Sequence, residues 1–145
     1  MQTSDENEAP TPPHAVPTPP LAVPTLDQAI APACVEAAAE ATDRFCAEHP
    51  EIVEWRGETG LAYTRHDFAY LLAWAVDAAE LDAPSIFAGN ALWLHGLLSN
   101  RGFRFEWFVR SLEIARDVAV DRGLLTPADA ARIVDPVIAQ VGIPG

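Results

Sequence analysis

The chain has 145 residues, half of them hydrophobic, and its 21 acidic and nine basic side chains give a formal net charge of -12 at pH 7. This excess of negative charge repels nucleic-acid phosphates and anionic lipid headgroups, so we expect neither a nucleic acid nor a membrane surface as a partner. The length is typical of one domain. The acidic start is unlike an export signal and no uncharged run is long enough to span a bilayer, so we expect a soluble, cytoplasmic protein.

The first 25 residues are rich in proline and threonine. Seven of the 13 prolines lie in this stretch, and the tetrapeptide Ala15–Thr18 recurs as Ala22–Thr25. Such a segment cannot form a backbone hydrogen-bond ladder or a core, so we expect a disordered tail, partly in polyproline II conformation. Pro17–Pro20 matches a PxxP ligand, although a solubilising arm is the more frequent role of such tails. Residues 26–145 are then expected to form a single helical domain.

Apolar residues recur at three- and four-residue steps through the remaining chain, which predicts helices. Pro50 ends the first of them, and two glycines indicate a short helical turn followed by a loop over residues 51–63. Thr64, with an acid three residues later, is typical of a helix start, where His66 would be a surface or capping residue. The predicted helices cover residues 26–49, 64–81, 85–100 and 103–122, and a last helix begins at 126.

Residues typical of helix starts and helix ends in the second half of the chain support an all-α fold. Pro84 suits a first helical position, and Gly102 and Gly123 suit the left-handed conformation that follows a helix end. Thr126 opens the last helix as its cap, and Pro136 should break it near residues 132–135. No segment alternates with a period of two. We therefore expect a bundle of about five main helices, with a globin-like arrangement as one form of it.

The chain carries no pattern that indicates catalysis. It has no Glu-x-x-His pair for a di-iron site, no Gly-x-Ser-x-Gly elbow and no glycine loop for phosphate. Cys46 and His49 supply two zinc ligands where four are needed. Cys34 and Cys46 lie twelve residues apart on one predicted helix, roughly 18 Å, which is too far for a disulfide. We expect a protein that is not an enzyme, with two free thiols and no metal.

The helix predicted over residues 85–100 is so rich in apolar residues that it should be central and wrapped on most sides. His95 lies on it, and a helical histidine that faces a cavity can ligate a haem iron. A histidine satisfied at a helix contact is commoner. Trp93 and the other aromatic residues nearby are in the same way either core or the wall of a pocket for a flat ligand.

Residues 63–120 resemble a known family. The segments Tyr63–Val76, Ser85–His95 and Leu98–Gly102, followed by Ser111–Glu113, are similar to the helical modular domain that precedes cobalamin-binding domains in bacterial sensory and regulatory proteins. They are also similar to the globin-like sensor domains without haem of stressosome proteins. In the cobalamin family the helical part covers the upper face of a corrinoid held by a separate α/β domain with an Asp-x-His-x-x-Gly loop. This chain lacks that loop.

The resemblance implies a freestanding regulatory or sensory module that acts through a partner protein or a homodimer. Asn90, Trp93 and Leu94 are the positions it implies as a ligand or partner face. The leading interpretation is a non-enzymatic bacterial regulator without a cofactor, which binds another protein through a helix face. The alternative is a sensor that encloses a tetrapyrrole, cobalamin or haem, or another flat apolar ligand between helices, with His95 pointing into the pocket.

Overall fold

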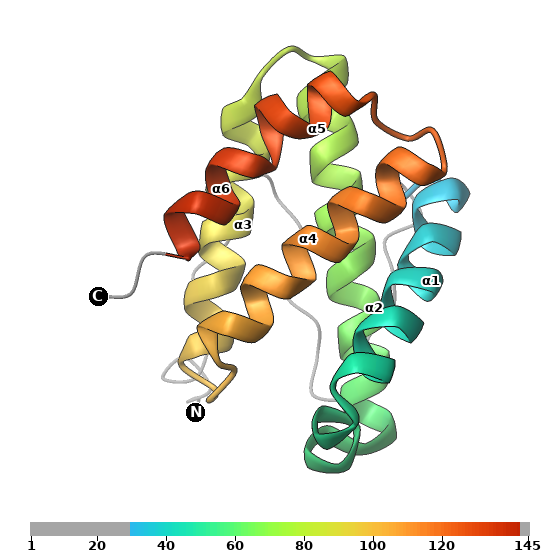
Figure 1. Cartoon of the computed structure of the whole chain (residues 1–145), viewed down its shortest axis with the longest axis vertical. Helices are drawn as coiled ribbons and strands as arrows, with labels where there is room; N and C mark the ends of the chain where they lie inside the picture. Colours follow the sequence, from blue (N-terminus) through green and yellow to red (C-terminus); the bar gives the residue numbers. More distant parts are fainter. Residues whose placement is uncertain (1–29, 143–145) are drawn as a thin grey trace, which may run out of the picture.

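The computed structural model describes residues 30–142, and within this range the chain is helical with no strand, which confirms the predicted all-α bundle (Figure 1). The tail predicted over residues 1–25 lies outside the described residues. The helices are α1 (Pro32–Glu48), α2 (Pro50–Glu80), α3 (Pro84–Ser99), α4 (Phe105–Asp121), α5 (Pro127–Ile133) and α6 (Asp135–Val141).

Proline sets most of the helix starts. Pro32, Pro50, Pro84 and Pro127 each occupy the first position of a helix, where the missing N–H would have had no helical acceptor. Pro50 ends α1 as predicted and begins α2 after the single residue His49. The predicted start of the first helix at residue 26 is not seen, because α1 begins at Pro32 and residues 26–29 lie outside the described range.

Residues in the left-handed conformation follow three helices. Gly102 and Gly123 have φ of 88° and 74°, and the residue after each donates its N–H back to a carbonyl five residues earlier, at 3.0 and 2.8 Å. Both ends were predicted. After α2 the same position is taken by Asp82 at φ 51°, and the N–H of Ala83 donates to the carbonyl of Ala78 at 2.8 Å. The end of this helix near residue 81 was predicted, but the left-handed conformation of Asp82 was not, because Asp is less usual there than Gly.

The loop predicted within residues 51–63 and the helix start at Thr64 are wrong. α2 is interrupted only at Gly57, whose φ of 69° and ψ of -166° are non-helical, and it then continues to Glu80. Thr64 lies inside the helix, where its hydroxyl donates to the carbonyl of Gly60 at 2.8 Å. A Cβ on Gly60 would overlap the side chain of Arg56. Gly60 thus serves a close approach between side chain and backbone within a helix, and not a turn.

The C-terminal prediction is confirmed. The N–H of Asp129 donates to Thr126 Oγ1 at 3.1 Å, so Thr126 caps α5. The helix then ends at Ile133, and α6 begins at Asp135 directly before Pro136. The break follows from the proline ring, which removes one helical hydrogen bond and crowds the carbonyl four residues earlier.

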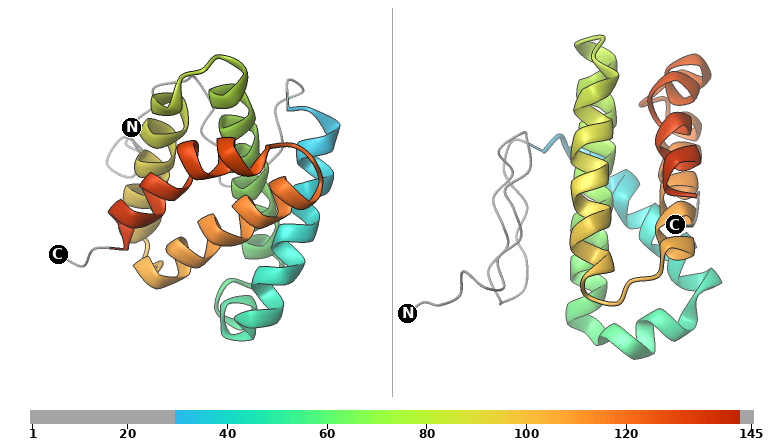
Figure 2. Two further views of the ribbon diagram at one scale, coloured as in Figure 1. Left: turned by 45° about the horizontal axis from the view of Figure 1, so that its top comes forward. Right: turned by 90° about the vertical axis from the view of Figure 1, so that its left-hand side faces the viewer.

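The helices form two layers around one hydrophobic core. α2 and α3 run antiparallel with α1 on the far side of α2, and α4, α5 and α6 cross over this layer on one side only (Figures 1 and 2). All six helices contribute to the buried cluster, whose largest fully buried side chains include Phe45, Phe68, Phe87 and Phe108. The layer of α2 and α3 therefore has an inner side against the core and an outer side.

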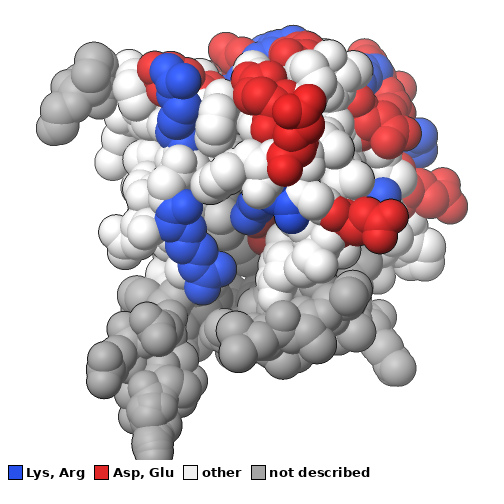
Figure 3. Space-filling model, turned by 90° about the horizontal axis from the view of Figure 1, so that it is seen from below, with Lys and Arg blue, Asp and Glu red and all other residues white. Residues whose placement is uncertain are grey.

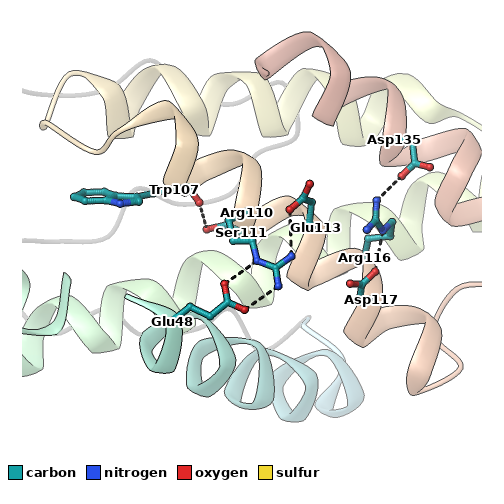
Figure 4. A network of polar contacts seen from close by, with 8 residues as sticks. All are labelled: Glu48, Trp107, Arg110, Ser111, Glu113, Arg116, Asp117 and Asp135. Atoms are coloured by element: carbon teal, nitrogen blue, oxygen red, sulfur yellow. Dashed lines mark hydrogen bonds and ion pairs between the residues drawn. The ribbon is translucent and has the colours of Figure 1, made fainter. Parts of the chain in front are cut away.

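Ion pairs connect the crossing helix α4 to α1 and to α6. Arg110 of α4 donates through Nε and Nη2 to both carboxylate oxygens of Glu48 at the end of α1, each at 2.8 Å (Figure 4). Arg116 of the same helix donates to Asp135 of α6 at 3.1 Å. Surface pairs add little stability individually, but the two-pronged geometry of Arg110 restricts how α4 can sit on α1.

Candidate functional site

The four residues of α3 singled out by sequence do not share one face. Consecutive residues of a helix point about 100° apart. Leu94 is 3% exposed and belongs to the core. His95 turns toward α4, with its ring centroid 5.1 Å from that of Phe108. Trp93 lies on the opposite flank, one turn after Asn90. Asn90 lies one turn before both Trp93 and Leu94 and therefore adjoins both, whereas His95 lies on the opposite flank from Trp93.

Leu94 lines a small cavity of about 20 Å³, which has room for roughly one water molecule. Arg56 and Thr64 contribute polar atoms to its wall, and Arg56 Nη1 donates to Thr64 Oγ1 at 3.1 Å. His95 is not among the residues that line it. The cavity as it stands is far smaller than a tetrapyrrole.

His95 sits between α3 and α4. Its Nε2 atom is buried and has no hydrogen-bond partner within residues 30–142. Burial lowers the pKa of His95 below its ordinary value, because the charged imidazolium loses hydration there. These surroundings favour a neutral imidazole packed against Phe108.

α3 is uncharged on every flank. No Asp, Glu, Arg or Lys occurs from Ala83 to Asn100. Phe87 and Leu94 face the core, and His95 faces α4 on one flank. Ile86, Asn90 and Trp93, spaced by one turn each, lie on the flank opposite to His95. This second stripe consequently faces the outer side of the layer that α2 and α3 form.

α2 has a similar outer stripe made of aromatic rings. Its inward side chains include Phe68 and Leu72, which are 2% and 1% exposed, and Tyr70 lies about 200° around the helix from Phe68. The rings of His66, Tyr70 and Trp74 follow one another, with centroids 4.7 and 5.9 Å apart. The predicted surface or capping role of His66 is wrong, since this residue is in mid-helix and only 7% exposed.

We define the outer face as His66, Tyr70 and Trp74 of α2 with Ile86, Asn90 and Trp93 of α3. Asn90 is 0% exposed, and Tyr70 and Trp74 are each 4% exposed. Among residues 30–142, however, no helix lies on the outer side of the layer (Figure 2, right). Asn90 Nδ2 donates to the carbonyl of Ile86 at 2.8 Å, which holds its amide on this stripe. The outer face is thus rich in aromatic rings and contains no Asp, Glu, Arg or Lys side chain.

A second cluster of aromatic rings lies at the end of the bundle where α4 begins. Trp55 is 51% exposed and its ring centroid lies 5.8 Å from that of Trp107, over which Arg104 stacks at 5.6 Å. Arg56 and Arg101 have no carboxylate within 4 Å in the described part of the chain. Figure 3 looks at this end, where blue patches at the left are bordered mainly by uncharged atoms. Positive charge therefore collects here on an otherwise acidic protein.

Comparison of the chain with family models, with curated protein sequences and with solved structures gave no match. No helix within residues 30–142 is long and apolar enough to cross a membrane. The same residues contain no group of three or more His, Cys, Asp or Glu side chains that is placed to hold a metal ion.

Proposed function

We propose that the chain is a non-enzymatic regulatory module which acts through protein–protein interaction, and that its outer face binds an extended proline-rich segment of a partner. The observation that carries this proposal is the contact between the rings of Tyr70 and Trp74 on α2, with centroids 5.9 Å apart, on the layer to which the neighbouring helix α3 contributes Trp93. Flat aromatic rings are the surfaces on which the pyrrolidine rings of polyproline II segments pack.

Hydrogen-bond chemistry supports the same ligand. A polyproline II segment presents backbone carbonyls that are not used within the segment, so its binding site must supply donors. The indole Nε1 of Trp93 is buried and has no acceptor among the described residues. A ligand carbonyl on this face would satisfy that donor.

The shape and charge of the face favour an extended chain over a charged ligand. Gly89 and Ala73 lie beside the aromatic residues, and their small size lets a backbone approach closely. Asp67 lies beside the face, with its Oδ1 3.3 Å from His66 Nδ1, and Asp77 is exposed farther along α2, whereas α3 offers no charged side chain. An acidic ligand would lose hydration here without gaining an ion pair.

The test uses a ten-residue oligoproline as the probe and NMR cross-peaks of the four tryptophan indole N–H groups as the readout. To remove a competing segment, the protein is the full chain with the seven prolines of residues 1–25 replaced by serine, which we call the tail-serine variant. We expect saturable shifts of the Trp74 and Trp93 signals while those of Trp55 and Trp107 stay unchanged.

Two further substitutions in the tail-serine variant complete this test. Trp93→Ala should weaken oligoproline binding at least tenfold, because an aromatic platform and a donor are lost together. Trp55→Ala is the matched control at the other aromatic cluster and should leave the affinity unchanged. The absence of a saturable shift, or shifts confined to Trp55 and Trp107, would overturn the proposed function.

A further inference from the structure

We infer that the end of the bundle where α4 begins is a second binding surface, and that it takes a short segment of a partner protein in which one or two carboxylates lie beside an aromatic residue. This surface, which we call the basic end, consists of Trp55 and Arg56 of α2, Arg101 and Arg104 between α3 and α4, and Trp107 of α4. It shares no residue with the outer face, so this inference does not depend on the proposed function.

Three stretches of the chain meet at the basic end. The indole of Trp55 lies 3.7 Å from the position that a Cβ on Gly102 would take, so the loop after α3 packs against the start of α2. The ring centroids of Trp55 and Trp107 are 5.8 Å apart, and that of Phe103 is 5.3 Å from Trp107. Because neighbouring rings already hold the two indoles, a ligand that stacks on them restricts little additional motion.

Arginine side chains lie against these rings. The guanidinium carbon of Arg56 is 5.9 Å from the ring centroid of Trp55, and that of Arg104 is 5.6 Å from the ring centroid of Trp107. Arg56 Nη1 also donates to Thr64 Oγ1 at 3.1 Å, which fixes the orientation of the guanidinium. An arginine that is stacked on a ring keeps the N–H groups at its edge available to a carboxylate.

Two arginines of the basic end lack the carboxylate partners that most arginines of the chain have. Six of the nine arginines contact a carboxylate among residues 30–142, namely Arg44, Arg104, Arg110, Arg116, Arg122 and Arg132. Arg56 and Arg101 are not among them. Arg104 pairs with Glu106 at 3.5 Å, but both side chains are more than half exposed, and exposed pairs add little stability. A ligand carboxylate can therefore bind here without displacing a strong internal pair.

The charge around Arg56 is incompletely balanced. Burial lowers the pKa of Arg56 below its ordinary value and the charge of Arg101 lowers it further, whereas Asp67 acts in the opposite direction. A carboxylate close to both arginines would offset the lost hydration and their mutual repulsion. In Figure 3 the blue side chains at the left of this end are bordered mainly by uncharged atoms, so an incoming carboxylate meets little negative charge there.

Exposed aromatic surface occurs at the same place. Three large hydrophobic side chains of residues 30–142 are exposed, and two of them, Trp55 at 51% and Phe105 at 36%, lie at or directly beside the basic end. Tryptophan and arginine are the residues most enriched where protein interfaces gain their binding energy. An aromatic residue of the ligand would stack on Trp55, and the carboxylates beside it would reach Arg56 and Arg101.

The acidic remainder of the protein restricts which anions can bind. A net charge of -12 repels a long polyanion such as a nucleic acid. At physiological ionic strength charges are screened over about 8 Å, so one or two carboxylates at the basic end interact mainly with the arginines beside them. A short acidic and aromatic segment of a protein therefore fits this surface better than a nucleic acid does.

The test titrates the full-length wild-type chain with the capped octapeptide Gly-Ser-Asp-Phe-Asp-Ser-Gly-Ser and follows the NMR cross-peaks of the tryptophan indole N–H groups. We expect saturable shifts of the Trp55 and Trp107 signals, while those of Trp74 and Trp93 stay unchanged. Matched peptides with both aspartates replaced by asparagine, or with the phenylalanine replaced by alanine, should bind at least tenfold more weakly, because each lacks one of the two recognised groups.

Two variants of the protein locate the carboxylate contact. Arg101→Gln should weaken binding of the aspartate peptide at least tenfold, because a charged donor is lost. Arg132→Gln is the matched control, since it removes the same charge from α5 at the opposite end of the bundle (Figure 1), and it should leave the affinity unchanged. Circular dichroism of both variants checks that the helical fold is retained.

Several results would overturn this inference. The first is the absence of a saturable shift at Trp55 and Trp107, and the second is equal affinity for the aspartate and asparagine peptides. Equal losses in Arg101→Gln and Arg132→Gln would likewise contradict it. A ten-nucleotide oligothymidylate that shifts the same signals at a lower concentration than the peptide would replace the acidic protein segment by a single-stranded nucleic acid. None of these results affects the proposed function, which is measured with oligoproline at Trp74 and Trp93.

Discussion

Trp93, Leu94 and His95 are consecutive residues of α3 and lie in three different surroundings. Trp93 is partly buried on the outer stripe, Leu94 is in the core beside a cavity, and His95 packs on Phe108 of α4. Substitutions at these neighbours should therefore have different effects, one on binding, one on stability and one on the pH dependence of stability. The binding effect of Trp93 belongs to the test of the proposed function.

Leu94→Ala should lower the free energy of unfolding by about 2–5 kcal/mol, since it deletes core contacts and enlarges an existing cavity. Urea denaturation followed by circular dichroism measures this change. Leu81→Ala is the control, because Leu81 is 68% exposed and its truncation should cost less than about 0.5 kcal/mol. Equal losses in the two variants would contradict the assignment of Leu94 to the core.

His95 should make the protein less stable as the pH falls below about 6.5. Burial lowers the pKa of His95 in the folded state, so the unfolded chain takes up a proton in a pH range where the folded chain does not. Stability rises with pH wherever the unfolded state binds more protons, and it is lost as the pH falls toward the lowered pKa. The unfolding free energy of the wild-type chain should drop more between pH 7.5 and 5.5 than that of His95→Gln. The same drop in both proteins would be evidence against a neutral, buried His95.

Backbone conformation at a few positions decides where the elements bend. Gly57 has φ of 69° and ψ of -166°, a region that residues other than glycine essentially avoid, and it separates the first turns of α2 from the long segment that ends at Glu80. Gly96, in the last turn of α3, has no positive φ, and neither glycine has a neighbour within 4 Å of an added Cβ. The two glycines thus differ in backbone conformation and not in the space around them.

Gly57→Ala should destabilise the protein by about 1–3 kcal/mol through backbone strain. Gly96→Ala should instead stabilise it by about 0.5–1 kcal/mol, because alanine loses less conformational freedom in a helix than glycine does. Thermal and urea unfolding of the two variants measure both changes. A stabilising Gly57→Ala would mean that α2 runs without a break through residue 57.

The whole described part of the chain is built on one core, to which all six helices contribute, and its outside is tied by arginine ion pairs such as Arg110–Glu48 and Arg122–Glu40. A structure of this kind should unfold in one cooperative step. The reactivity of the two free cysteines can be used to follow this unfolding step. The two thiols differ in burial, because Cys34 is 3% exposed and Cys46 is only partly buried. Burial raises the pKa of both thiols, and Asp77 and Glu80 raise that of Cys34 further.

In the native protein Cys34 should react with a thiol reagent only through global unfolding, whereas Cys46 should react faster. Single-cysteine chains, made with Cys46→Ala and with Cys34→Ala, separate the two rates. The protection of Cys34 should match the unfolding equilibrium constant from urea denaturation. Labelling of Cys34 much faster than this constant allows would show that α1 detaches from the core on its own.

Local signals in the sequence were enough to place most helix boundaries. Pro50 and Pro84 at helix starts, Gly102 and Gly123 after helix ends and the break before Pro136 were predicted correctly, because each effect acts within about one turn of its own residue. The all-α class followed from periodicity in the same way.

The roles of Gly60 and Thr64 were not predicted, although both depend on contacts with Arg56 within the same helix. The composition around Gly60 resembles a loop, and only the packing of Arg56 over it explains a helical glycine there. The candidate site, too, was predicted only in part from the sequence. The sequence indicated α3 as the helix of interest, and it named Asn90, Trp93, Leu94 and His95 on it. The helical repeat fixes which of these four share a face, but what each of them contacts depends on where α2 and α4 lie against α3, and those positions are set by contacts between residues far apart in the chain.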